Sequence, residues 1–228
     1  MPDETMPSLP TPDATDMPRA SSCLGGALGC GGAVLLDVLA LVVAVAWGSG
    51  GSTDFPRVAP EEMANRALQR SHEAYDVLGF TRTIEPGVED IGVSTENTLG
   101  SSFCYDGGPL GLEDKTIDGA YSMSHQWALD DVPGTQAMPG LRRLHQYFKD
   151  HDWKISAYRE GEQGRDWELF VQRDGGDERM SFVWYADRNY FTGGASVPCA
   201  YDPTWRTGDA GPAGDNERPP AFGPTPQG

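Results

Sequence analysis

Residues 167–186, WELFVQRDGGDERMSFVWYA, are the stretch that decides the fold of this 228-residue chain. Two runs rich in aromatic and apolar residues, 167–173 and 178–186, flank the sequence DGGD at 174–177. Glycine and aspartate in the centre of such a connection accept the positive φ angles that tight hairpin turns require. The stretch therefore predicts two antiparallel strands joined by a short turn.

Strand patterns continue on both sides of this hairpin. Segments 153–159 and 190–198 have the length and composition of further strands, and residues 116–129 alternate between apolar and polar side chains. An alternating strand places every second side chain on the same face of its sheet. One face of this strand comprises Tyr121, Met123, His125, Trp127 and Leu129, and the opposite face comprises Ala120, Ser122, Ser124, Gln126 and Ala128.

Two helices complete the predicted domain. The first begins at Pro60 and is ended by Gly79, and acidic residues in its first turn suit the helix dipole. The second is expected to open at Pro139 and Gly140. A helix, then strands, a helix and a run of antiparallel strands predict an α+β fold. We expect a two-layer domain with helices packed on one face of a mostly antiparallel sheet.

An uninterrupted apolar stretch, residues 24–47, precedes this domain. About 20 apolar residues cross a bilayer as a helix, so the stretch is predicted to be one transmembrane helix. Its leucines and valines together favour insertion by roughly 5 kcal/mol, and Asp37 opposes insertion by about 2.5–3.5 kcal/mol. The alternative is a secretory signal cleaved after the small-x-small sequence at 44–46, which would release the protein.

Three residues of the stretch are candidates for contacts between membrane helices. Gly25 and Gly29 form a GxxxG pattern, which allows two helices to approach closely. Asp37 lies near the midpoint of the stretch, where an acidic residue usually has a partner. These residues predict a protein partner, or a homo-oligomer, formed through the transmembrane helix.

Composition divides the rest of the chain. Residues 1–23 are predicted to be a disordered cytoplasmic arm, and residues 48–59 a flexible linker rich in Gly and Ser. Residues 60–202 are expected to form the extracytoplasmic α+β domain, which is long enough for a single core. The end of the chain, 203–228, is rich in Pro and Gly and is predicted to be a disordered tail.

Cys104 and Cys199 are the two cysteines that follow the membrane stretch. A lone pair flanking one domain beyond an export segment predicts a disulfide, and two buried free thiols are the alternative. Closing a loop of about 95 residues would stabilise the fold by about 4–5 kcal/mol. An oxidised pair belongs to an oxidising space, so we expect a single-pass protein of the cell membrane with its amino terminus inside and its main domain outside.

The chain is strongly acidic. Its 34 acidic residues outnumber its 17 Lys and Arg residues, which gives a net charge of −17. The negative electrostatic field of such a chain repels the phosphate groups of nucleic acids, so nucleic-acid binding is not expected. The expected partners are the membrane and, through the predicted transmembrane helix at 24–47, a protein or a second copy of the chain.

No residue pattern identifies a reaction. His145 and His151 are six residues apart, a spacing that does not bring two imidazoles onto one ion, and the chain lacks a G-x-S-x-G motif. We therefore predict no catalytic residue, no metal site and no cofactor. An enzyme would have to use His125 or the acidic turns, which are Asp130 with Asp131 and Asp174 with Asp177.

Tryptophan is abundant for a domain of this size. Core packing is the first interpretation of Trp127, Trp167 and Trp184. If the helices leave these residues uncovered, the same three side chains would form a binding face for a protein, a peptide or a glycan.

The sequences HDWKI at 151–155, WEL at 167–169, MSFVW at 180–184 and PC at 198–199 resemble a pattern of uncharacterised exported proteins of high-GC Gram-positive bacteria. That group consists of single-pass, membrane-anchored proteins. The resemblance covers the second half of the domain and the overall layout, and it implies a location without implying an activity.

Together these features predict a membrane-anchored extracytoplasmic binding or protein-interaction module without catalytic activity. A cell-envelope hydrolase or metal-dependent enzyme is the alternative.

Overall fold

The computed structural model describes residues 54–106, 115–161 and 165–225. The predicted arm, the predicted membrane helix with Gly25, Gly29 and Asp37, and the first part of the predicted linker lie outside the described residues. Neither helix of the described part combines the length and the hydropathy that crossing a bilayer requires.

The first described helix, α2, spans Pro60–Leu78, as the sequence predicts. Glu61 and Glu62 lie in its first turn, at the positive end of the helix dipole. Gly79 ends the helix in the left-handed conformation, with a φ of 75°, and its N–H donates to carbonyl groups of the last turn. One stripe of the helix is buried and comprises Met63, Ala64, Ala67, Leu68, Ser71, Ala74, Tyr75 and Leu78.

The second helix, α3, spans Gly134–Asp150 and begins before the predicted start at Pro139. Ala137 is fully buried ahead of that proline, so tertiary packing holds the first turn in place. Gly134 lets the helix approach the sheet closely, because a Cβ at this position would lie 2.8 Å from the indole ring of Trp184. Burial of the first turn therefore overrides the local proline signal.

The strands predicted between residues 116 and 198 are all present. The pairing of β5 with β6 across a 3-10 turn at Asp174–Gly176 confirms the predicted hairpin. The bounds of the strands are β1 Gly87–Val88, β2 Glu96–Asp106, β3 Lys115–Leu129, β4 Lys154–Arg159, β5 Trp167–Arg173, β6 Glu178–Tyr185, β7 Tyr190–Ser196 and β8 Ala200–Tyr201.

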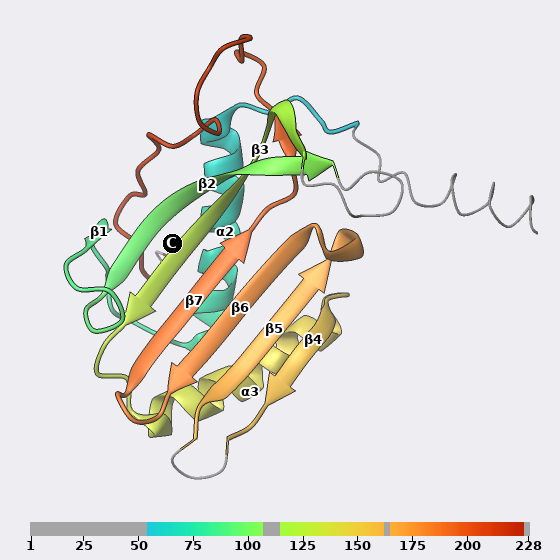
Figure 1. The fold of residues 1–228 in the computed structure, drawn as a ribbon. Coiled ribbons are helices and arrows are strands. Elements are labelled where there is room, and N and C mark those ends of the chain that lie inside the picture. Colours follow the sequence, from blue (N-terminus) through green and yellow to red (C-terminus); the bar gives the residue numbers. More distant parts are fainter. Residues whose placement is uncertain (1–53, 107–114, 162–164, 226–228) are drawn as a thin grey trace, which may run out of the picture. The chain divides into compact units, whose positions relative to one another are not determined.

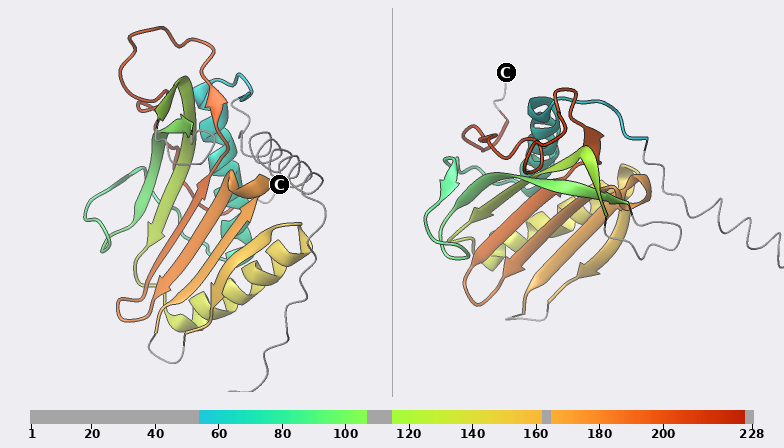
Figure 2. Two further views of the ribbon diagram at one scale, coloured as in Figure 1. Left: turned by 45° about the vertical axis from the view of Figure 1, so that its right-hand side comes forward. Right: turned by 45° about the horizontal axis from the view of Figure 1, so that its top comes forward.

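The strands form one antiparallel sheet in the order β1-β2-β3-β7-β6-β5-β4, with β8 paired to β3. Figure 1 shows both helices behind this sheet, where α2 packs against β3 and β7 and α3 against β4 and β5. The turned views of Figure 2 show the same two layers. The predicted α+β class, with helices on one face of an antiparallel sheet, is confirmed for the described domain.

The core lies between the sheet and the two helices. Trp127 is near its centre, with its ring stacked on Phe191 at a centroid distance of 5.7 Å. Gly193 makes room for this indole, since a Cβ there would lie 2.2 Å from the ring. The apolar strand face predicted from alternation is at most 1% exposed at Tyr121, Met123, His125, Trp127 and Leu129.

The predicted end of the domain at residue 202 is wrong. Phe222 is fully buried, and its ring centroid lies 4.9 Å from that of Tyr75 and 4.8 Å from that of His125. Its backbone pairs with Ile84 in both directions, with N···O distances of 2.7 and 2.9 Å. The segment predicted to be a disordered tail therefore contributes to the core.

Side chains of α2 and β2 hold the same segment, which we call the C-terminal strap and define as residues 219–225. Asn97 Nδ2 donates to the carbonyl oxygen of Pro220 at 2.8 Å and to that of Ile84 at 3.1 Å. The hydroxyl of Thr225 donates to the carboxylate of Asp76 at 2.6 Å. The strap is thus fixed at both of its ends.

The predicted flexible linker is also wrong for its described part. Val58 is buried, and its carbonyl accepts a hydrogen bond of 2.7 Å from the hydroxyl of Tyr121. The N–H of Val58 donates to Tyr201 of β8 at 3.0 Å. The domain therefore begins before Pro60.

Cys104 of β2 and Cys199 form the predicted disulfide, with their Cα atoms 6.2 Å apart. The bond joins β2 to the segment between β7 and β8, and its two cysteines are 95 residues apart in the sequence. It covalently connects two parts of the domain that α3 and the strands β3 to β7 separate in the sequence.

Candidate functional site

The three tryptophans of the predicted binding face are buried. Trp127, Trp167 and Trp184 are 1%, 3% and 6% exposed. The indole N–H of Trp184 donates to the carbonyl of Val132 at 2.9 Å, and the guanidinium of Arg142 lies over the ring of Trp167. The helices cover the sheet face on which these rings lie, so the tryptophan face is wrong and core packing is the correct interpretation.

His125 is also buried, and its Nε2 donates to the side-chain oxygen of Asn97 across 3.0 Å. The other ring nitrogen, Nδ1, is buried and has no hydrogen-bond partner among the described residues. Burial, followed by the charge of His72, lowers the pKa of His125 from its ordinary value to about 3. His125 is therefore a neutral imidazole that orients Asn97, which in turn holds the C-terminal strap.

The buried His125 should make the domain less stable as the pH falls from 7 to 5.5. The unfolded chain takes up a proton near pH 6.5, whereas the folded state keeps the imidazole neutral down to about pH 3. A folded-state pKa below the unfolded one means that stability is lost as the pH drops through 6.5, by about 1.3 kcal/mol over this interval. Chemical denaturation at both pH values measures the loss, and His125→Gln should reduce it by that amount. An equal pH dependence in both proteins would contradict this role.

Two other histidines lie against aromatic rings near α3. His145 stacks on Tyr158 with ring centroids 3.9 Å apart, and His151 stacks on Tyr147 at 4.0 Å. The two imidazoles are therefore held by separate tyrosines. In the described ranges no group of three or more His, Cys, Asp or Glu side chains is arranged to hold a metal ion.

The acidic turn after β3 does not join His125 in one site. Asp130 pairs with Arg82 at 2.6 Å, and Asp131 is exposed at the turn position with a φ of 51°. His125 lies four residues before the end of β3, which is about 13 Å along an extended strand. A buried imidazole and an exposed carboxylate at this separation do not form a catalytic pair.

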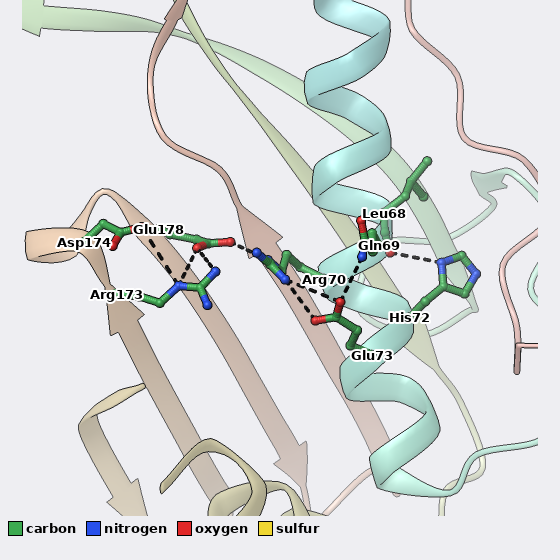
Figure 3. A network of polar contacts seen from close by, with 8 residues as sticks. All are labelled: Leu68, Gln69, Arg70, His72, Glu73, Arg173, Asp174 and Glu178. Atoms are coloured by element: carbon green, nitrogen blue, oxygen red, sulfur yellow. Dashed lines mark hydrogen bonds and ion pairs between the residues drawn. The ribbon is translucent and has the colours of Figure 1, made fainter. Parts of the chain in front are cut away.

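A buried ion-pair network connects α2 to the hairpin of β5 and β6 (Figure 3). Glu178 is 4% exposed and accepts hydrogen bonds from Arg70 Nε at 2.6 Å and from Arg173 Nε at 2.9 Å. Arg70 also pairs with Glu73 at 3.1 Å. Both carboxylate oxygens of Glu178 are occupied, so the network fixes the helix to the sheet and offers no group for chemistry.

The sheet face opposite the helices is covered by no helix or strand of the described residues, and Figure 1 views the sheet from this side. We call it the uncovered face. Strand alternation gives it the positions that the core does not use, and these are mostly small and polar. On β3 and β7 the uncovered face carries Ser122, Ser124, Gln126, Thr192, Gly194 and Ser196.

Strand register arranges the uncovered face in two rows, each of which crosses five strands. The first row contains Thr98, Gln126, Gly194, Ser181 and Phe170. The second row contains Ser124, Ser196, Arg179, Gln172 and Lys154.

A hollow of about 340 Å³ lies over these rows, at the lower end of the range of about 300–1,000 Å³ for small-molecule sites. Gly194 makes room for the Gln126 side chain over this part of the sheet, because a Cβ there would lie 2.4 Å from Gln126 Oε1. Phe170 supplies an aromatic ring. Five polar side chains that line the hollow make no hydrogen bond within the structure: Gln126, Ser156, Gln172, Ser181 and Ser196.

A larger depression of about 700 Å³ lies beside the connection from β4 to β5. Its charges largely satisfy one another, since Arg159 pairs with Glu168 at 3.3 Å and Arg188 with Asp187 at 3.7 Å. The guanidinium of Arg188 also lies over the ring of Tyr185. The hollow of the uncovered face, with its unpaired polar groups, is therefore the better candidate for a site.

The sequence pattern alone does not identify the polar lining of the hollow. Its signal is present in the alternation of β3, where Ser124 and Gln126 stand between core residues. The partners on other strands had no such signal, because the register that places Gln126 opposite Gly194 is not visible in the sequence.

No family model matches the chain, and no curated protein shows significant similarity to it. The uncovered face and its hollow are therefore the features on which a function is proposed.

Proposed function

We propose that this protein is a membrane-anchored extracytoplasmic binding module without catalytic activity, and that the uncovered face is its binding surface. The observation that carries the proposal is the difference between the two faces of the sheet. One face encloses the core under α2 and α3, while the other remains polar. A two-layer domain does not need the second face for its core, which leaves that face available for recognition.

The uncovered face suits recognition by side chains. The strands beneath it are paired in continuous ladders, so the backbone groups of the central strands are already hydrogen-bonded. The same ladders hold the side chains of the two rows in fixed positions. A ligand would therefore meet a preorganised surface, and little conformational entropy would be lost on binding.

The proposed location is the outer side of the cell membrane. Residues 24–47 would anchor the chain with its amino terminus inside, and the Cys104–Cys199 disulfide suits an oxidising space. The resemblance to exported proteins of high-GC Gram-positive bacteria supports the same location. Cleavage at 44–46 would give a secreted protein with the same binding surface.

We also propose that the membrane helix has a partner, which is another protein or a second copy of the chain. Gly25 and Gly29 would allow the two helices to approach, and Asp37 would supply a polar contact. The net charge of −17 supports a role without nucleic acid. The burial of His125 and the bonding of both domain cysteines support a role without catalysis.

Photo-crosslinking in native membranes tests the uncovered face. A crosslinking amino acid placed at Ser122, on this face, is expected to label a ligand at least tenfold more strongly than one placed at Asn65, an exposed position of α2. Adding Ser196→Arg should remove the label by placing a long cation on the face, because Ser196 pairs with Ser124, two residues from Ser122. The free energy of unfolding of that variant should change by no more than about 0.5 kcal/mol, because Ser196 lies outside the core. Equal labelling from Ser122 and Asn65 would refute the proposal.

A further inference from the structure

The hollow of the uncovered face has the chemistry of a sugar-binding site. We propose that it binds a neutral saccharide, whose hydroxyl groups would bond to Gln126, Gln172 and Ser181 and whose ring would stack on Phe170. The inference rests on the proposed function, because it names the ligand class of the same face.

The polar groups of the hollow match hydroxyl groups in kind. A glutamine amide carries one acceptor and two N–H donors, and a serine hydroxyl both donates and accepts. Sugar hydroxyls also donate and accept, so each can pair with either type of side chain. Because Gln126, Gln172 and Ser181 have no partner within the structure, a ligand at these groups would displace only water.

Other classes of ligand fit the hollow less well. Arg179 is the only charged residue among the described residues that line it, and its Nε already donates to the carbonyl of Gly176. A polyanion would also be repelled by the net charge of −17. Among the described residues of the lining Phe170 is the only aromatic one, and the side chains of Val171 and Met180 are buried in the core, so a hydrophobic ligand would find a single exposed ring. An extended peptide would find no free backbone groups on these central strands.

The arrangement of the first row suits a flat ring-shaped ligand. Phe170 pairs with Ser181, Ser181 with Gly194, and Gly194 with Gln126. The side-chain amide of Gln126 lies over Gly194, since a Cβ there would lie 2.4 Å from Gln126 Oε1. Two strand spacings, about 10 Å, therefore separate the aromatic ring from this amide, with Ser181 between them. The row offers stacking at one end and hydrogen bonds at the other.

Calorimetric titration of the full-length protein in lipid nanodiscs tests the inference, with maltose, cellobiose and chitobiose as probes. Nanodiscs avoid the sugar headgroups of maltoside detergents. We expect at least one probe to bind saturably. Gln126→Ala and Phe170→Leu should each weaken that binding at least tenfold, and the latter keeps an apolar side chain while it removes the ring. Ser102→Ala, an exposed position on β2 outside the hollow, should change it less than twofold.

Absence of binding by all three disaccharides at about 10 mM would overturn the inference, since even a weak site with a Kd of about 1 mM would be nearly saturated. Binding by Gln126→Ala and by Phe170→Leu that is as strong as binding by the wild type would overturn it as well. If Ser122 still gives a specific crosslink under these conditions, the binding module stands and only the saccharide is wrong. If the crosslink is also absent, the proposed function fails too.

Discussion

Replacing Phe222 with alanine should lower the free energy of unfolding by about 3–5 kcal/mol. The ring is fully buried and contacts Tyr75 and His125, so its removal leaves a cavity that the surrounding side chains cannot easily fill. The effect should be large although Phe222 belongs to a segment rich in Pro and Gly, because that segment is part of the core and not an appendage. Urea denaturation of the full-length protein measures the difference.

Phe103→Ala is the matched control, because Phe103 is 39% exposed on β2. Removing this ring should lower the free energy of unfolding by less than about 1.5 kcal/mol, since much of the ring is already in contact with water. Deleting residues 219–228 should destabilise the domain at least as much as Phe222→Ala, because it removes the ring together with the partners of Asn97 and Asp76. A Phe222→Ala variant no less stable than Phe103→Ala would show that the strap is dispensable.

Removal of the disulfide is the second change with a large expected effect. The free energy of unfolding of the double variant Cys104→Ala, Cys199→Ala should be about 4–5 kcal/mol lower than that of the oxidised protein. The reason is that the bond restricts a loop of 95 residues in the unfolded chain. Many domains of this size are stable by only about 5–15 kcal/mol. The variant should therefore be close to unfolding at physiological temperature.

A reducing agent provides the control for this measurement. Reduction should destabilise the wild-type domain by nearly the same amount and should leave the double variant unchanged. Cys23 and Cys30 are present in both proteins, so any effect through them cancels. Equal stability of the oxidised wild type and the double variant would contradict a stabilising disulfide.

The sequence predicts the second half of the domain well because its signals are local. The turn at 174–177 and the alternation on either side of it define β5 and β6 without help from distant residues. Gly79 ends α2 for an equally local reason. The sequence pattern predicts a start of α3 that is too late. The true start depends on the close approach of Gly134 to Trp184, and these two residues are far apart in the chain.

The C-terminal strap could not be predicted from composition. Pro and Gly in residues 203–228 are typical of disordered segments, and Phe222 alone gives no periodic pattern. The segment is ordered because the sheet and α2 offer it a site, through Asn97 and Asp76. Because the sheet and α2 order the strap through contacts with distant residues, the sequence of the strap itself contains no pattern that predicts this order.

The candidate site shows the same limit. The alternation in β3 correctly places Trp127 and Gln126 on opposite faces of the sheet. It does not tell which of the two faces the helices cover. That choice depends on the packing of α2 and α3, which buried the tryptophans and left the amide exposed. The hollow additionally depends on Gly194 lying opposite Gln126, which is a property of strand register.

The two ends of the sheet differ in how far they oppose edge-to-edge aggregation. The strand at one end, β1, has only two residues. The strand at the other end, β4, is interrupted by a bulge between Ile155 and Ala157 and carries Lys154 and Arg159. However, β1 pairs only with Glu96 and Asn97, so it leaves the rest of the outer edge of β2 without a partner strand in the described sheet. We therefore expect strand addition at high local concentration to use the outer edge of β2 and to avoid β4.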